Sequence, residues 1–145
     1  SQPFIVAFMT DAAKIKPTHK ILEIGTGCGY QTAILAKLAK EVYTMEVLKP
    51  LSEEAKFRLE SLGYNNINFI IGNGYEGLPQ EAPFDVIIVT AAPAEIPENL
   101  IKQLKDGGRL IIPVGTIKQE LIRITRHQDE IKREFLMDVR FVPMV

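Results

Sequence analysis

The run Ile21-Leu22-Glu23-Ile24-Gly25-Thr26-Gly27-Cys28-Gly29-Tyr30 places three alternating glycines directly after a short apolar segment. Glycine lets a backbone turn tightly and approach a ligand closely, so the run predicts a strand, a binding loop and the start of a helix. Dinucleotide sites use the spacing Gly-x-Gly-x-x-Gly, whereas this loop has Gly-x-Gly-x-Gly with an acidic residue two positions before it. The combination favours S-adenosylmethionine over NAD. The alternative is a tight turn that binds nothing.

The loop and its acidic neighbour predict how the amino-acid end of this cofactor would be held. The backbone of Gly25, Thr26, Gly27 and Gly29 would wrap that end, because the glycines leave room for a close approach. The carboxylate of Glu23 would bind the ammonium group, directly or through water. We therefore assign these five residues to a cofactor site.

Two later strand ends predict the nucleoside part of the same site. Glu46 ends the next predicted strand, where a carboxylate can accept hydrogen bonds from both ribose hydroxyls, and Val47 follows it. Asn73 and Gly74 follow the third predicted strand, where an amide oxygen can accept from the adenine amine. The alternatives are a solvated strand-end acid at Glu46 and a plain turn at Asn73.

Around the loop, short β-branched apolar runs alternate with longer segments of helical period. This alternation predicts an α/β, Rossmann-like fold in which a mostly parallel seven-stranded sheet carries helices on both faces. Two last strands with no helix between them predict a C-terminal antiparallel hairpin. The expected strands are residues 20–24, 42–46, 67–71, 84–90, 109–114, 119–126 and 134–142, and the expected helices are residues 30–40, 51–62 and 98–104.

Composition narrows the class of protein. With 145 residues, 46% hydrophobic and 24% charged, the chain suits one globular domain over residues 1–145. A net charge of −1 without runs of like charge argues against nucleic acid as a partner. No apolar stretch approaches the roughly 18 residues of a membrane span, and no signal pattern opens the chain, so neither membrane nor secretion is expected. The lone Cys28 allows no intrachain disulfide, which favours the cytoplasm, and its thiol is expected to be buried packing.

Four segments, in order, resemble one family, the protein-L-isoaspartate O-methyltransferases. Residues 22–32, LEIGTGCGYQT, resemble its first motif, and residues 83–93, PFDVIIVTAAP, resemble its fourth strand and substrate loop. Residues 107–115, GGRLIIPVG, resemble its fifth strand, and residues 139–143, VRFVP, resemble its C-terminal signature. The resemblance implies methyl transfer from S-adenosylmethionine to the α-carboxylate of L-isoaspartyl residues in damaged proteins, in a repair reaction.

The resemblance also implies the residues that act on the substrate. Ser1 opens a Ser-Gln-Pro run like the family's Thr-Ile-Ser-Gln-Pro motif, whose serine is assigned as the active-site residue, and would hold one carboxylate oxygen. Arg140 would attract the substrate carboxylate, or else pair with an acid at the sheet edge. Tyr30 and Phe141 are expected in the core. The substrate pocket would be shaped by Thr90, Ala91, Ala92 and Pro93, of which Thr90 also borders the cofactor.

The reaction implied by the resemblance needs few catalytic groups. A carboxylate is already ionised at neutral pH, and the sulfonium methyl is already activated, so neither a metal nor a strong general base is required. Two positions depart from the family pattern. Asn73 stands where Asp is usual and keeps an acceptor without the charge, and Cys28 stands where Ser or Ala is more usual.

Two other functions remain open from the sequence. One is a methyltransferase for nucleic acid or a small molecule, although the Asn/Asp-Pro-Pro-aromatic motif that holds a flipped base is replaced by Thr-Ala-Ala-Pro. The other is a cofactor-binding core without turnover, because family members carry an N-terminal helical region before the Ser-Gln-Pro motif that this sequence is expected to lack. The family expectation is a monomer, but loss of that cover would favour self-association.

Overall fold

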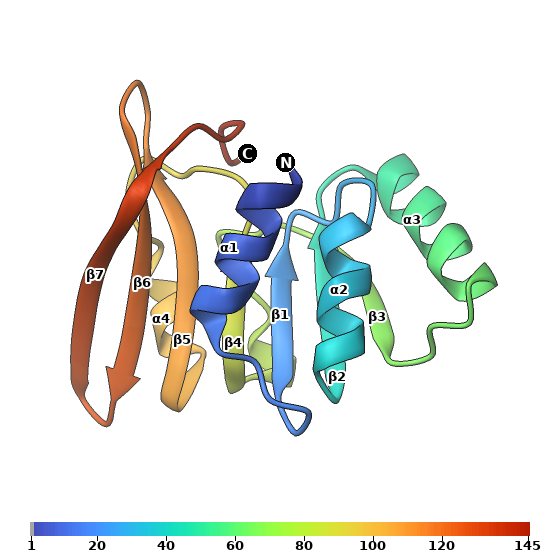
Figure 1. The fold of residues 1–145 in the computed structure, drawn as a ribbon, viewed down its shortest axis with the longest axis horizontal. Coiled ribbons are helices and arrows are strands. Elements are labelled where there is room, and N and C mark those ends of the chain that lie inside the picture. The colour runs from blue at the N-terminus through green and yellow to red at the C-terminus, as the bar shows by residue number, and fades with distance from the viewer. Residues whose placement is uncertain (1) are drawn as a thin grey trace.

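Seven strands form one mixed sheet in this computed structural model, which describes residues 2–145 (Figure 1). Ser1, the predicted active-site serine, lies outside the described residues. The strands are β1 Lys20–Ile24, β2 Glu41–Glu46, β3 Ile67–Ile71, β4 Phe84–Val89, β5 Leu104–Gly115, β6 Gln119–His127 and β7 Glu130–Val139. The helices are α1 Pro3–Ala13, α2 Tyr30–Leu38, α3 Lys49–Ser61 and α4 Glu98–Lys102, with a short 3₁₀ turn η1 Pro79–Glu81.

The strand order across the sheet is β3-β2-β1-β4-β5-β6-β7. Strands β1 to β5 pair in parallel, while β6 runs antiparallel to both β5 and β7. The predicted seven-stranded, mostly parallel sheet with a C-terminal antiparallel hairpin is therefore confirmed. The order reverses direction between β1 and β4, and in open α/β sheets ligands bind outside the carboxyl ends of the strands at such a switch point.

Helices cover both faces of the sheet, as predicted. Successive side chains of a strand point to opposite faces, so Ile21 and Leu22 enter different cores. Ile21 packs with Met9 of α1 and Leu35 of α2, the two helices in front of the sheet in Figure 1. Leu22 packs with Leu100 of α4 on the other face. Each such fully buried aliphatic side chain contributes about 1.5–3 kcal/mol relative to an exposed one.

Helix α1 was not predicted from the sequence. Its buried positions Val6, Met9 and Ala13 recur at helical spacing, and Pro3 occupies its first turn, where the missing N–H costs nothing. The helix ends at Ala13, and the C-cap residue Lys14 adopts the left-handed conformation with φ 52°. These signals were present in the sequence, and they place the start of a helix at the proline of the Ser-Gln-Pro run.

Two predicted strands had bounds that were wrong by more than one residue. Strand β5 begins at Leu104, not at residue 109, because Gly107 and Gly108 form a bulge inside it, where the register with β4 shifts. Strand β7 begins at Glu130 because a two-residue turn closes the hairpin, and it ends at Val139, so Arg140 lies outside the sheet. The predicted helices are confirmed, with ends displaced by two residues at most.

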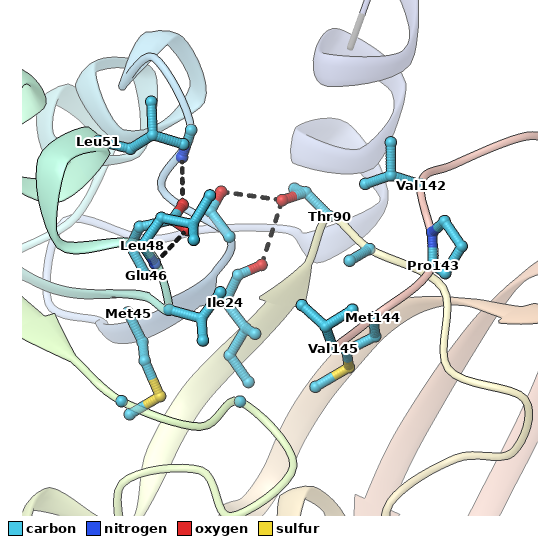
Figure 2. A pocket seen from close by; sticks show the side chains of 16 residues that line it. Ile24, Met45, Glu46, Leu48, Leu51, Thr90, Val142, Pro143, Met144 and Val145 are labelled. Atoms are coloured by element: carbon cyan, nitrogen blue, oxygen red, sulfur yellow. Dashed lines mark hydrogen bonds between the residues drawn. The ribbon is translucent and has the colours of Figure 1, made fainter.

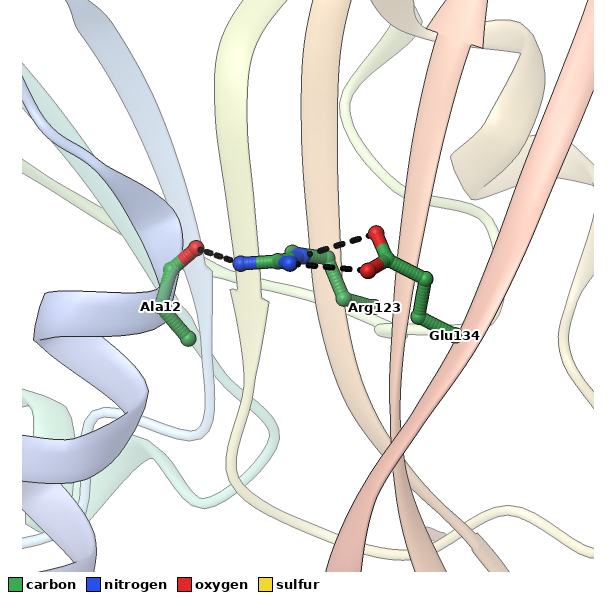
Figure 3. Close-up of polar contacts among 3 residues, drawn as sticks. All are labelled: Ala12, Arg123 and Glu134. Atoms are coloured by element: carbon green, nitrogen blue, oxygen red, sulfur yellow. Dashed lines mark hydrogen bonds and ion pairs between the residues drawn. The ribbon is translucent and has the colours of Figure 1, made fainter.

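A guanidinium joins α1 to the C-terminal hairpin. Arg123 on β6 donates from Nε and Nη2 to the two carboxylate oxygens of Glu134 on β7, at 3.2 and 3.0 Å. Its Nη1 donates to the carbonyl oxygen of Ala12 near the end of α1, at 3.1 Å (Figure 3). This bidentate geometry fixes both partners and links segments that are far apart in the sequence. Helix α1 is therefore anchored by one side chain of the hairpin.

Replacing Glu134 by Gln is expected to lower the melting temperature by a few degrees at most at neutral pH, because a solvent-accessible ion pair contributes little. The Arg123 hydrogen bonds hold the pKa of Glu134 below its ordinary value. The contribution of this pair is therefore present above the unfolded-state pKa and is lost as the pH falls through the lowered folded-state pKa. Thermal melts of the wild type and Glu134→Gln should converge in acid. Arg123→Lys, which keeps the charge but not the bidentate geometry, serves as the comparison. An equal difference at every pH would contradict this account.

Candidate functional site

The carboxyl ends of β1 and β4 meet at the switch point. The backbone N–H of Thr90 donates to the carbonyl oxygen of Ile24 at 2.9 Å, and Thr90 Oγ1 donates to the carbonyl oxygen of Gly25 at 2.9 Å. Gly25 has φ +102°, and a Cβ there would lie 2.3 Å from Thr90 Oγ1. The position therefore requires glycine for two reasons, backbone conformation and space.

A mostly apolar cavity opens on one side of this junction, and we call it the apolar cavity. Figure 2 shows Val142 to Val145 facing Leu48 and Leu51 across it. Ile24 and Met45 line it between these two walls. Of the predicted cofactor residues, those that line the apolar cavity are Gly25, Gly27, Glu46, Val47, Gly74 and Thr90. A mostly apolar cavity with few polar groups suits an aromatic ring system such as adenine.

Glu46 ties the glycine loop to the end of β2. Its Oε1 accepts from the backbone N–H of Gly27 and its Oε2 from that of Leu48, each at 3.0 Å. The side chain is buried, so the alternative of a solvated strand-end acid does not describe it. Each carboxylate oxygen keeps a further lone pair, and both can still accept from neighbouring hydroxyls. The geometry thus brings Glu46 to the loop as expected.

Asn73 lies beside the apolar cavity, but its amide is already engaged. Its Oδ1 accepts from the backbone N–H of Tyr75 at 2.9 Å, and its side chain is exposed. The neighbours Gly72 and Gly74 line the cavity, whereas Asn73 does not. A Cβ at Gly74 would lie 2.4 Å from Ile24 Cγ2, so glycine is needed there. The structure therefore shows a turn at Asn73, and its contact with adenine stays a prediction.

A second, more polar cavity lies on the other side of the junction, and we call it the polar cavity. It shares Gly25, Gly27, Thr90 and Val142 with the apolar cavity, so the two meet at the glycine loop. Val6 of α1 adds an apolar wall. Its remaining lining residues are Glu23, Thr26, Cys28, Tyr30, Gln31, Arg140 and Phe141.

Glu23 is fully buried in the wall of the polar cavity. Its Oε1 accepts from the hydroxyls of Thr32 and Thr44, the latter at 2.6 Å. Its Oε2 has no hydrogen-bond partner among the described residues. Burial raises the pKa of this carboxyl to about 7, against the two threonine hydrogen bonds, which lower it. A buried, half-satisfied carboxylate beside a cavity indicates a cationic ligand.

Gln31 was missed as a site residue. It is buried, its Oε1 is unpartnered among the described residues, and its Nε2 donates weakly to Thr10 Oγ1 at 3.5 Å. It therefore adds an acceptor to the same cavity as Glu23. Its place in the first turn of α2, directly after the glycine loop, was the signal that could have revealed it.

The predicted substrate loop divides into two parts. Thr90 and Ala91 line the apolar cavity, whereas Ala92 and Pro93 are buried behind it. The backbone N–H of Ala92 donates to the carbonyl oxygen of Val142 at 2.8 Å, and that of Met144 donates back to Ala92 at 3.0 Å. Residues 142–145 were missed as a cavity wall, because only this long-range pairing, which no local pattern reveals, brings them there.

Arg140 and three neighbours lie around the mouth of the polar cavity. Arg140 is exposed, and among the described residues no carboxylate forms an ion pair with it. Two core expectations were wrong: Cys28, within the glycine loop, is exposed rather than buried, and Tyr30, directly after the loop, is 49% exposed; both line the polar cavity. Phe141 is half-buried and packs against the core beneath α1.

Among residues 2–145, no helix is long and apolar enough to cross a membrane.

Comparison with known proteins gives a consistent result. The family model for protein-L-isoaspartate(D-aspartate) O-methyltransferase matches residues 1–145. The chain is 57% identical over 145 residues to a protein-L-isoaspartate O-methyltransferase of Dictyoglomus thermophilum, covering 99% of this chain and 66% of that protein. It is 53% identical over 144 residues to one of a Picosynechococcus species, covering 99% of this chain and 65% of that one.

A solved structure agrees. It is described as a protein-L-isoaspartate O-methyltransferase of Plasmodium falciparum in complex with S-adenosyl-L-homocysteine. It superposes with a TM-score of 0.87 at 28% identity, covering 100% of this chain and 75% of that one. The chain spans about two thirds of the length of the curated relatives it matches.

Proposed function

Since the chain belongs to the protein-L-isoaspartate(D-aspartate) O-methyltransferase family, we propose that it takes part in methyl transfer from S-adenosylmethionine to the α-carboxylate of L-isoaspartyl residues in proteins. The observation that carries the proposal is the unpartnered Oε2 of Glu23, a buried residue that lines the polar cavity where it adjoins the apolar cavity at the β1/β4 switch point. A ligand with an ammonium group at one end and a flat aromatic ring at the other matches this pair of cavities.

The described residues fit the cofactor group by group. Glu23 would bind the ammonium, since a buried carboxylate with a free oxygen needs a cationic donor. Glu46, which lines the apolar cavity and accepts a hydrogen bond from Gly27 where the two cavities meet, would accept from the ribose hydroxyls. The adenine ring would lie between Leu48 and the segment 142–145, where the walls are apolar. When bound, the cofactor supplies a methyl group that its sulfonium already activates.

The chain's own residues would then have to position the substrate carboxylate next to the cofactor. A substrate carboxylate is ionised at neutral pH, so it needs orientation and exclusion of water rather than a general base. Thr90 lies where the two cavities meet, Ala91 lines the apolar cavity beside it, and the exposed Arg140 offers a cation at the polar cavity. Ser1 stays the proposed contact to one carboxylate oxygen. We also propose one domain and a cytoplasmic location, the latter on the lone Cys28.

The test is transfer of labelled methyl from S-adenosylmethionine to matched peptides that contain isoaspartate or aspartate at the same position. We expect labelling of the isoaspartyl peptide alone, and base-labile release of the label as expected for a methyl ester. Binding of S-adenosylhomocysteine is measured on the same preparation. Cofactor binding with neither peptide labelled would leave the chain as a cofactor-binding core. Equal labelling of both peptides would contradict the proposed substrate.

A further inference from the structure

Buried hydroxyl groups around Glu23 form a chain that links three elements. Thr32 in α2 and Thr44 in β2 both donate to Oε1 of Glu23. Thr26 Oγ1, in the glycine loop, lies 2.6 Å from Thr44 Oγ1. A hydroxyl has one hydrogen to donate, so Thr26 must be the donor to Thr44. The glycine loop is therefore connected to Glu23 through the neighbouring strand.

Among the described residues, only one of the two oxygens of the Glu23 carboxylate accepts hydrogen bonds. Oε1 accepts two hydroxyl hydrogen bonds, while Oε2 accepts none among the described residues, although both oxygens are out of contact with solvent. On β2 the register partner of Glu23 is Thr44, and on β4 it is the apolar Ile88. The two threonines thus fix the plane of the carboxylate, because tilting it out of this plane would break both hydrogen bonds, and a half-turn only exchanges two equivalent oxygens.

We propose that Thr44 and Thr32 are positioning residues for the cofactor, which keep Oε1 of Glu23 occupied so that Oε2 alone meets the ammonium of the amino-acid end. This inference rests on the proposed function, since it assumes that the polar cavity receives that end of S-adenosylmethionine. It assigns roles to two side chains that do not line either cavity. Their effect reaches the ligand only through Glu23.

The positioning has a consequence for pH dependence. Ammonium binding requires the ionised carboxylate, and the pKa of Glu23 is raised to about 7, chiefly by burial. Cofactor affinity should therefore increase as the pH rises through about 7 and then level off. The hydrogen bonds from Thr32 and Thr44 lower this pKa, so removal of either hydroxyl should move the increase to higher pH.

The other titratable or charged groups near Glu23 do not account for the expected shift of the pH profile in the threonine variants. On β2, Glu46 raises the Glu23 pKa through repulsion, and α1 and β4 present the apolar Val6 and Ile88. The titratable or charged side chains that line the same cavity are Cys28, Tyr30 and Arg140. These are unchanged in the threonine variants, so a shift of the pH profile on removing a threonine hydroxyl reports on Glu23.

The experiment compares two ligands on four proteins. S-adenosylhomocysteine carries the amino-acid end, whereas methylthioadenosine lacks it and reports only on the apolar cavity. Both are titrated by calorimetry from about pH 6 to about pH 8, a range that brackets the raised carboxyl pKa. The proteins are the wild type, Thr44→Val and Thr32→Val, which lose a hydroxyl at similar shape, and Thr44→Ser, which keeps it.

We expect Thr32→Val, which loses one hydrogen bond to Glu23, to weaken S-adenosylhomocysteine about 3- to 10-fold near neutral pH and to move the pH dependence upward. Thr44→Val loses its hydrogen bond to Glu23 and the one from Thr26, so its effect should be at least as large. Thr44→Ser should keep the wild-type profile, and methylthioadenosine should bind all four proteins equally. If Thr44→Val does not fold, Thr32→Val carries the same comparison. A wild-type profile in the valine variants, or equal loss of both ligands, would overturn the inference and leave the proposed function intact. A folded wild type that binds no S-adenosylhomocysteine would overturn the proposed cofactor itself.

Discussion

Glu23→Gln is expected to weaken S-adenosylhomocysteine binding roughly 10- to 100-fold, because hydrogen bonds to a charged partner are worth about 1.5–3 kcal/mol. The free Oε2 is the acceptor that the ammonium would use, and an amide group offers it no negative charge. Calorimetric titration measures the loss. Methylthioadenosine, which has no ammonium, should bind the variant and the wild type alike, and its loss from the variant would contradict the assignment.

The same substitution should stabilise the ligand-free protein. Burial raises the Glu23 pKa to about 7, so the folded state resists ionisation of this carboxyl. The resulting penalty is absent below the unfolded-state pKa, grows as the pH rises, and is complete above the folded-state pKa. Glu23→Gln should therefore melt higher than the wild type at about pH 8, and the two should coincide near about pH 4. A lower melting temperature at alkaline pH would contradict the raised pKa.

Gly25→Ala should abolish detectable cofactor binding and lower the stability of the fold. The added Cβ would meet Thr90 Oγ1 at 2.3 Å and disrupt the hydrogen bonding of this hydroxyl to the carbonyl oxygens at the carboxyl end of β1. The φ of +102° adds a backbone cost of about 1–3 kcal/mol for a residue with a side chain. Both effects act at the point where the two cavities meet. Thermal melts and titration with S-adenosylhomocysteine measure them together.

Gly63→Ala is the matched control for that variant. Gly63 has a similar φ of +93°, but a Cβ there would meet no atom within 4 Å, and the residue lines neither cavity. It should lose stability through the backbone alone and keep wild-type affinity for the ligand. If Gly63→Ala and Gly25→Ala lost affinity to the same extent, the effect at Gly25 would be one of general stability.

Much of the fold could be predicted from local patterns. The glycine loop, the strand ends at Ile24 and Glu46 and the closing hairpin all follow from periodicity and glycine placement, which are properties of short segments. The boundaries that failed depend on tertiary pairing. Gly107 and Gly108 form a bulge only because β4 lies beside them, and Arg140 leaves the sheet because the following residues pair with Ala92.

In the candidate site, too, residues next to the glycine loop were predicted and residues brought in by long-range contacts were not. Glu23, Gly25 and Glu46 were predicted from their positions next to the loop, and the structure brings them to adjoining cavities. The wall at residues 142–145 and the hydroxyl chain through Thr44 connect segments distant in the sequence, so no single-segment pattern contained them. Asn73 shows the converse case, because a correct position beside the cavity did not determine where its side chain points.

The most direct test of the central claim, that the joined cavities at the β1/β4 switch point hold the cofactor, is a nuclear magnetic resonance titration of the isotope-labelled chain with S-adenosylhomocysteine. We predict that the backbone amide signals of Gly25, Gly27 and Gly74 shift and saturate together, while that of Gly63 stays in place and NAD leaves all four unchanged. Shifts confined to amides outside the two cavities, or a response to NAD in place of S-adenosylhomocysteine, would contradict the account.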